Sequence, residues 1–231
     1  SRTPQSWFSS LENRVAVDSI RATDATIIYE EFKTGHDQPG RLTIDDVDLR
    51  ALHVRHEPGR RSTPDTMSLE IRGKLMHEGE LRLAISTPLD ASRMTMWVRG
   101  SLGAMDAQAL NPLIEHVTPA RIKSGRIDGV VFEYTVRNDI ARGVVVPRYR
   151  DLGADITGTG SGGILGAKNP IGGLLRAGAE AAQGLKVRQN NPDKPDRPPR
   201  VGQVNHTFGG ESLPSWFWNV LKQGLLSVAM K

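Results

Sequence analysis

The sequence contains no cysteine. This absence excludes disulfide bonds, thiolate zinc sites, iron–sulfur clusters and a cysteine nucleophile, and it leaves the redox compartment open. Aromatic residues make up only 5%, whereas there are 24 glycines and 14 prolines among the 231 residues. Frequent glycine and proline argue against a bundle of long helices. We therefore expect short elements, mostly strands.

Long apolar runs are also missing. No stretch of 18 or more apolar residues occurs, so no transmembrane helix is predicted. The first residues, Ser1 to Pro4, lack an initiator methionine and the apolar segment of a signal peptide. A processed N-terminus or an excised fragment is expected to begin in this way. With 38% hydrophobic and 24% charged residues, the chain has the composition of a folded protein and is long enough to bury a core.

The net charge of +4 is unevenly distributed. Residues 1–119 carry 14 basic and 17 acidic residues, whereas residues 120–231 carry 16 and 9. Only the second half could offer a basic surface, and its basic residues are scattered, without interleaved aromatic side chains on which bases would stack. We therefore predict that nucleic acid is not a partner.

Residues 14–104 have the pattern of successive strands, in which β-branched and aromatic residues alternate with polar ones. The alternation changes phase near Asp45 and Asp46, as a bulge would cause. The clearest hairpin joins residues 67–75 to residues 81–85 through a turn at residues 78–80.

A short helix is predicted over residues 106–116, with Asp106 as its N-cap and a break or restart at Pro112. Strands resume after it and turn back at Asn138 and Asp139. Pro147 in the returning strand indicates a sheet edge or a bulge at that point.

The expected fold class is mainly β: a curved antiparallel open sheet or groove with a few short helices, including a C-terminal amphipathic helix. The sheet body spans residues 1–157. Residues 158–200 form a segment rich in glycine and alanine, with a helix near 174–183, followed by a proline-rich linker or mobile loop at 190–200. Residues 201–231 supply a last strand and the final helix, near 214–230.

Possible nucleotide and metal motifs have ordinary explanations. Gly158, Gly160 and Gly163 fit a dinucleotide-binding pattern, but the following acidic residue, Glu180, lies in an alanine-rich helical stretch and not at the end of a second strand. A flexible loop is the better interpretation. His53 and His56 are three residues apart, which places them on opposite faces of a strand, so solvated histidines are expected.

The acidic cluster of Asp45, Asp46 and Asp48 lacks the spacing of a calcium loop, which favours a structural or solvated role. No nucleophile-elbow motif is present. We therefore predict no enzymatic activity, no catalytic residue, no metal and no cofactor.

The last segment is the most suggestive. Asn219, Gln223 and Ser227 recur at every fourth position and form a polar stripe on a helix whose remaining surface is broadly apolar. Such a helix usually packs on a sheet. Trp216 and Trp218 also favour a membrane interface, where Lys222 and Lys231 would meet anionic lipid, so a membrane or partner contact stays open.

The order of elements resembles the C-terminal region of AsmA-like, bridge-like lipid transfer proteins of the Gram-negative envelope. The similarity rests on the following segments: residues 20–30 (IRATDATIIYE), residues 103–113 (GAMDAQALNPL), residues 122–129 (IKSGRIDG), Ala141-Arg142-Gly143, residues 147–152 (PRYRDL) and the closing aromatic helix. It extends over residues 14–231. The membrane helix at the N-terminus of the family has no counterpart here, which suggests a piece of a longer protein anchored in the inner membrane.

The resemblance implies a periplasmic envelope protein that contributes to outer-membrane maintenance by carrying phospholipid along an apolar β-groove. The expected partners are phospholipid or a membrane surface and, alternatively, another envelope protein docked on the sheet face and the final helix. The candidate lipid or membrane contacts are Trp216, Phe217, Trp218, Val220, Leu221, Leu225, Ile71 and Leu83.

Overall fold

A computed structural model describes residues 4–32, 38–56, 66–89, 91–117, 120–156 and 187–230. The elements in chain order are α1 (Pro4–Ser9), β1 (Val15–Glu31), β2 (Gly40–His56), β3 (Thr66–Leu75), β4 (Gly79–Pro88), β5 (Met96–Leu102), β6 (Met105–Asp106), a 3₁₀ turn (Ala107–Leu110), α2 (Asn111–Val117), β7 (Ala120–Arg137), β8 (Ile140–Ile156), β9 (Gly202–Thr207) and α4 (Leu213–Ala229).

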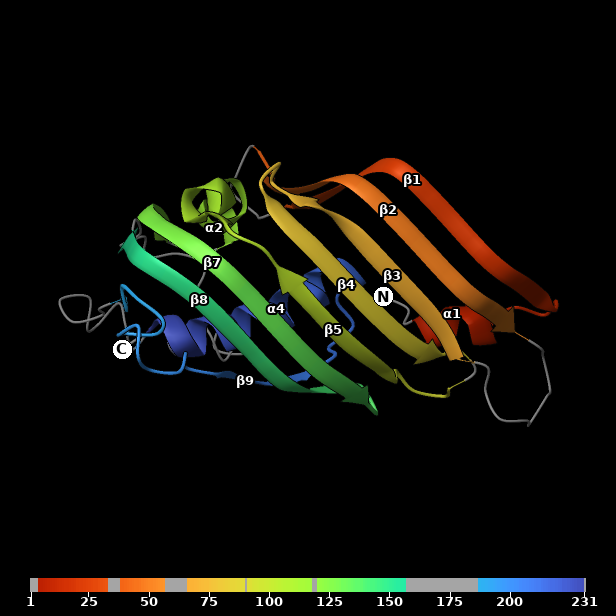
Figure 1. Cartoon of the computed structure of the whole chain (residues 1–231). Coiled ribbons are helices and arrows are strands. Elements are labelled where there is room, and N and C mark those ends of the chain that lie inside the picture. The colour runs from red at the N-terminus through yellow and green to blue at the C-terminus, as the bar shows by residue number, and fades with distance from the viewer. Residues whose placement is uncertain are drawn as a thin grey trace.

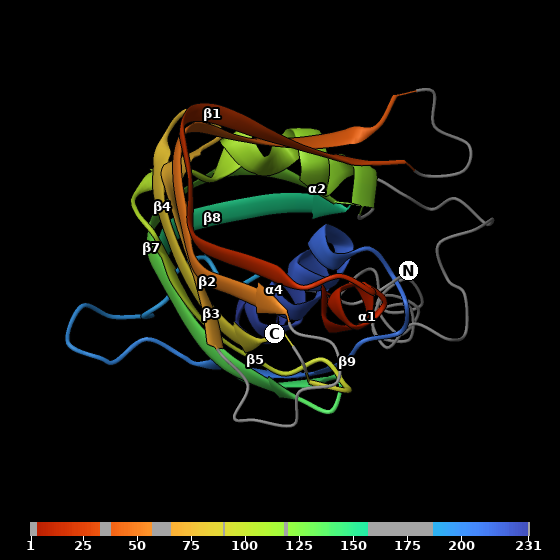
Figure 2. The same ribbon diagram turned by 90° about the vertical axis from the view of Figure 1, so that its right-hand side faces the viewer.

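The strands form one open antiparallel sheet of nine strands in the order β1-β2-β3-β4-β5-β7-β8-β9, with β6 paired to β7 (Figure 1). The predicted fold class, mainly β with a few short helices including one at the C-terminus, is therefore confirmed. The sheet curves, and α1, α2 and α4 lie on its concave side (Figure 2). We call this side the inner face and the opposite side the outer face.

The expectation of short strands is wrong. β1, β2 and β8 each have 17 residues and β7 has 18. Bulges explain how such long strands follow the curve of the sheet, because each bulge bends the strand and increases its twist. The predicted phase change is one of them: Asp46 has φ 51° and the β2–β3 register shifts between Asp45 and Asp48.

Both predicted hairpins are confirmed, but the first turn lies earlier than predicted: it is formed by residues 76–78, because Gly79 and Glu80 already belong to β4. β3 and β4 pair in continuous register from Thr66 with Pro88 to Leu75 with Gly79. β7 and β8 turn at Asn138 and Asp139, which have φ values of 52° and 70°. Such left-handed conformations are tolerated best by asparagine, aspartate and glycine.

The main core lies between the inner face and α4. Residues of β5, β7 and β8 alternate so that their apolar side chains point inward, and Val98, Tyr134, Val136 and Val145 are at most 1% exposed. Trp216 of α4 is fully buried against them. Over β5, β7 and β8 the sheet thus has a solvent-exposed outer face and a buried inner face, as the period-2 pattern predicts.

The predicted helix over residues 106–116 is confirmed, in two parts. Asp106 caps the 3₁₀ turn by accepting a hydrogen bond from the Gln108 backbone N–H, and α2 starts at Asn111, next to Pro112. α1 was not predicted. Its buried Gln5 donates hydrogen bonds to Thr87 Oγ1 at 2.7 Å and to the Thr95 carbonyl at 3.0 Å, which fixes it at one end of β4.

Residues 190–200, expected to form a linker or mobile loop, are anchored. Asn191 is fully buried, and its backbone exchanges hydrogen bonds of 2.8 and 3.0 Å with Tyr149 of β8. Its side chain accepts from the Arg200 N–H at 2.7 Å and donates to the Pro147 and Arg200 carbonyls. Pro147 lies beyond Val145, the last residue of β8 that pairs with β9, so its predicted position at a sheet edge is confirmed.

Candidate functional site: the inner face and its covering helix

An apolar row crosses the inner face from β2 to β7. Leu49 pairs with Ile71, Ile71 with Leu83, and the row continues through Gly100 to Phe132. Phe132 is 5% exposed and belongs to the core under α4, whereas Leu49, Ile71 and Leu83 are half-buried. The predicted contact residues Ile71 and Leu83 therefore lie side by side on the inner face, at the border of the main core.

The other predicted contact residues lie on α4, and most of them pack into the protein itself. Trp216 and Val220 are fully buried, and Phe217, Leu221 and Leu225 are partly buried against the same core. The rings of Tyr134 and Trp216 meet edge to face, with centroids 6.2 Å apart. The final helix thus covers the β7–β9 part of the inner face, and Trp216 and Val220 can touch lipid only if α4 moves.

Two contacts with the backbone of β9 hold α4 in place. A Cβ added at Gly202 would lie 2.0 Å from the Gly224 carbonyl oxygen, so the strand and the helix touch through their main chains. The Gln223 side chain accepts a hydrogen bond from the Asn205 N–H at 3.0 Å and donates to the Asn205 carbonyl at 3.2 Å. Part of the predicted polar stripe of the helix therefore binds the last strand.

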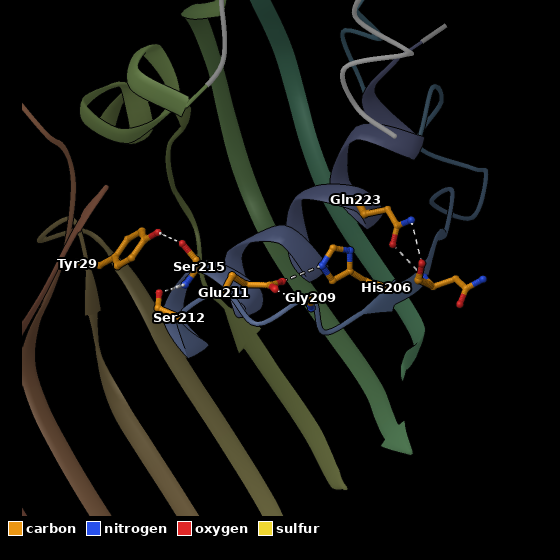
Figure 3. A network of polar contacts seen from close by, with 8 residues as sticks. Tyr29, His206, Gly209, Glu211, Ser212, Ser215 and Gln223 are labelled. Atoms are coloured by element: carbon orange, nitrogen blue, oxygen red, sulfur yellow. Dashed lines mark hydrogen bonds and ion pairs between the residues drawn. The ribbon is translucent and has the colours of Figure 1, made fainter. Parts of the chain in front are cut away.

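The turn that leads into α4 is fixed by polar contacts (Figure 3). The Glu211 carboxylate lies 3.3 Å from His206 Nε2 and accepts a hydrogen bond of 2.7 Å from the Gly209 N–H. Ser212 is the N-cap, and its side chain accepts from the Ser215 N–H. These contacts define where the helix begins and in which direction it leaves the sheet.

A second group of polar contacts joins α4 to β1, the strand at the opposite edge of the sheet from β9. The Ser215 hydroxyl lies 2.9 Å from the Tyr29 hydroxyl (Figure 3). Ser215 also donates to Glu31 Oε2 at 3.0 Å, and Tyr29 donates to Glu31 as well. We call Tyr29, Glu31 and Ser215 the β1–α4 latch. Lys222 follows Ser215 by two helical turns, so it lies on the same side of α4. Burial lowers the pKa of Lys222, and the negative charge of Glu31 opposes this shift.

Two polar atoms in the core have no hydrogen-bond partner among the described residues: the Tyr134 hydroxyl and Trp216 Nε1. Burial raises the pKa of Tyr134 well above its usual value, so this hydroxyl stays neutral. The indole nitrogen of Trp218 is buried in the same unpartnered way, although the residue as a whole is half-buried. The aromatic residues at the start of α4 thus pack through their apolar rings, and the indole N–H groups of Trp216 and Trp218 donate to no described residue.

Each aspartate of the acidic cluster lies next to a different basic side chain. Asp45 pairs with His77 at 2.9 Å, Asp46 with Lys74 at 3.0 Å, and Asp48 with Arg21 at 3.6 Å. No group of three or more histidine, aspartate or glutamate side chains gathers in a metal-binding arrangement within the described ranges. The predicted structural role of the cluster agrees with these pairs.

One of the two histidines is not solvated. His53 is exposed, but His56 is 5% exposed and its Nε2 lies 3.1 Å from the Leu11 carbonyl. The glycine motif at residues 158–163, Glu180 and the helix expected near 174–183 lie outside the described residues.

Sequence reasoning missed the latch and the Gln223–Asn205 pair. Tyr29 and Glu31 lie on β1 and Ser215 on α4, more than 180 residues apart in the chain, so no local pattern links them. Gln223 carried a signal, since it belonged to the polar stripe, but its partner could not be predicted without the position of β9.

Comparison with protein families, curated proteins and solved structures gives no match for this chain. Among the helices described, none has the length and apolar character needed to cross a membrane.

Proposed function

We propose that this chain is a non-enzymatic segment of an AsmA-like envelope protein and that it binds phospholipid acyl chains on the inner face of its sheet. The observation that carries the proposal is the half-buried apolar row of Leu49, Ile71 and Leu83, which continues the core beyond its main part. Acyl chains gain about 0.8 kcal/mol for each CH₂ that leaves water, so an apolar surface can bind lipid without any catalytic group.

In this proposal α4 is a cover that is hinged on β9. The helix holds β8 and β9 through buried residues, a backbone contact and the Gln223 amide. Its polar contacts with β1, among the described residues, are the latch and the charge attraction between Glu31 and Lys222. Breaking a few partly exposed hydrogen bonds costs much less than removing Trp216 from the core. Lipid therefore gains access between α4 and β1.

The location and the partner follow from the resemblance. The segment lies in the periplasm as part of an inner-membrane-anchored protein, takes up phospholipid and contributes to outer-membrane maintenance. The curved sheet with an apolar inner face and a charged outer face is suited to shelter acyl chains in water, and strands of 17 residues span roughly 55 Å.

The test is lipid retention. The chain of residues 1–231 is expressed in a Gram-negative host and purified without detergent. It is then analysed by native mass spectrometry and by organic extraction. We expect bound phospholipid in the wild type and its loss in Ile71→Asp or Leu83→Asp, because a carboxylate on the inner face excludes acyl chains.

The matched control is Val131→Asp on β7, which adds the same charge to the outer face, where Val131 is 60% exposed. Circular dichroism shows whether each variant is folded, and Ile71→Ser replaces Ile71→Asp if the latter unfolds. A lipid-free wild type, or a folded inner-face variant that keeps its lipid, contradicts the proposal.

A second candidate function is docking of another envelope protein through the sheet and α4. The observation that favours it is the cover itself, since α4 already fills part of the inner face with Trp216 and Val220. A photo-crosslinking residue at position 218 distinguishes the two functions in cells. Cross-links to phospholipid support lipid binding, whereas one reproducible protein adduct, absent when the probe is at exposed position 227, supports docking.

A further inference from the structure

The outer face carries a shallow hollow of about 380 Å³ over β3, β4, β5 and β7. Figure 1 shows these four strands in front of α4, so the outer face is the one toward the viewer. Each strand contributes three successive residues to it. Because side chains alternate, the first and third residue of each strand point outward, and the middle residue contributes mainly its backbone. The outward residues are Glu70, Arg72, Arg82, Ala84, Arg99, Ser101, Val131 and Glu133.

The hollow exists because two small residues lie among long ones. Arg82 pairs with Ser101 and Ala84 pairs with Arg99 across β4 and β5. The two arginines therefore occupy one diagonal of a square and the two small residues occupy the other. Diagonal neighbours in a sheet are about 7–8 Å apart, a separation that long side chains span easily. Two guanidinium groups can thus meet above a floor made by Ala84 and Ser101.

A third arginine adds to the positive charge. Arg72 stands directly opposite Arg82 in the β3–β4 register. Like charges in this position destabilise a sheet, so the arrangement has an energetic cost. The only ion pair of Arg82 within the described part of the chain is a long one, 3.7 Å to the exposed Glu80. Arg72 and Arg99 form no ion pair with any described residue, although Glu133 is opposite Arg99.

A guanidinium group is a planar fork of N–H donors that fits two oxygens of a phosphate or a carboxylate. We propose that Arg72, Arg82 and Arg99 form a binding site for a single oxyanion of the phosphate type on the outer face. The acidic side chains of Glu70 and Glu133 at the rim leave one net positive charge among the five ionised residues. They favour a small anion and repel an extended polyanion such as nucleic acid.

This site lies on the opposite face from the proposed lipid surface and does not depend on that function. The test is a calorimetric titration of the full chain with inorganic phosphate at low ionic strength. We expect saturable binding with a dissociation constant below about 10 mM. Arg82→Gln or Arg99→Gln is expected to raise this constant at least about tenfold. Ala84→Leu fills the floor without changing the charge and is expected to abolish binding.

Two variants serve as controls on the same face. Arg142→Gln on β8 removes an exposed charge outside the hollow, and Ser86→Leu introduces the same leucine side chain on β4 beside it. Neither is expected to change the affinity. Absence of saturable binding, an equal loss in Arg142→Gln, or unchanged binding in Ala84→Leu overturns the proposal.

A free anion and a lipid headgroup share this chemistry, and a second experiment separates them. Phosphatidylcholine vesicles with and without phosphatidic acid are mixed with the chain and floated on a gradient. Flotation that requires phosphatidic acid and is lost in Arg82→Gln identifies a headgroup as the ligand. Phosphate binding without flotation identifies a free anion as the ligand.

Discussion

Gln223 of α4 pairs with both backbone groups of Asn205 on β9, accepting from its N–H at 3.0 Å and donating to its carbonyl at 3.2 Å. The same arrangement occurs twice more among the residues that the structure describes. Asn111 at the start of α2 pairs with the backbone of Ile122, and Asn191 pairs with that of Arg200. In each case the side-chain amide forms hydrogen bonds with a backbone N–H and a backbone carbonyl that are not paired with a strand on that side. Backbone groups that are buried or lie at a sheet edge need such partners.

The first prediction concerns this pair. Gln223→Ala is expected to lower the free energy of unfolding by about 1 kcal/mol, since two partly exposed hydrogen bonds are lost. The measurement is urea denaturation followed by circular dichroism. Asn219→Ala on the same polar stripe is the control and is expected to be neutral or slightly stabilising, because alanine is the better helix former. Equal effects of the two variants would show that the pair contributes nothing.

The second prediction concerns the contact between β9 and α4. Gly202→Ala is expected to destabilise the fold by about 2 kcal/mol or more, because the new Cβ would lie 2.0 Å from the Gly224 carbonyl oxygen and the helix has to shift. Gly129→Ala on β7 is the matched control, since its nearest atom, the Leu102 carbonyl oxygen, is 3.4 Å away. Thermal unfolding of both variants checks the difference; a midpoint for Gly202→Ala at or above that of Gly129→Ala contradicts the close approach.

The third prediction concerns the β1–α4 latch. Ser215→Ala removes the hydrogen bonds to Tyr29 and Glu31, so the first two turns of α4 are expected to open more often while the turn around Val228 stays protected. Amide hydrogen exchange measured by mass spectrometry follows the two halves of the helix separately. Ser227→Ala, which loses only a bond to the Gly224 carbonyl, is the control. Uniform exchange along α4 in Ser215→Ala would mean that the helix moves as a whole.

The fourth prediction is a pH dependence caused by Lys222. Burial lowers its folded pKa below the ordinary value of 10.5, which it regains in the unfolded chain. Between the two values the unfolded state binds more protons, so stability rises with pH through this window. Below the window the charged lysine carries its full desolvation cost. Lys222→Met is therefore expected to be more stable than the wild type at neutral pH and to lack the alkaline rise.

Urea denaturation at a series of pH values up to about 10 tests this prediction. Above the ordinary tyrosine pKa of 10.0 the buried Tyr134 acts in the opposite direction, because only the unfolded chain ionises it. A wild-type profile that is flat between neutral pH and 10, or one that Lys222→Met does not alter, contradicts the assignment.

Much of the fold could be predicted because its signals are local. The β3–β4 hairpin follows from strict alternation, the bulge from the phase change at Asp46, and the turn after β7 from Asn138 and Asp139. Strand length could not be predicted, because the sequence does not distinguish a glycine or proline inside a curved strand from one that marks the end of a strand. Pro147, for example, lies within β8 and pairs with Val130.

The candidate site depends on contacts that are distant in sequence. The apolar arc of α4 indicated burial, but the pattern could not distinguish a sheet from a membrane as its partner. The structure places Trp216 against Tyr134. The anchoring of residues 190–200 was hidden for a similar reason, since Asn191 lies among prolines and charges and is buried only through its contacts with β8.

The two edges of the sheet are not equivalent. At β9 the strand is short and Gln223 occupies the outward backbone groups of Asn205. At β1 a strand of 17 residues has a single partner, β2, within the described part of the chain, and Ile20 and Ile28 are 45% and 49% exposed. Within the described residues, one edge of the sheet is therefore covered, whereas β1 presents a long row of backbone groups without a partner strand, interrupted by the bulge at Asp24.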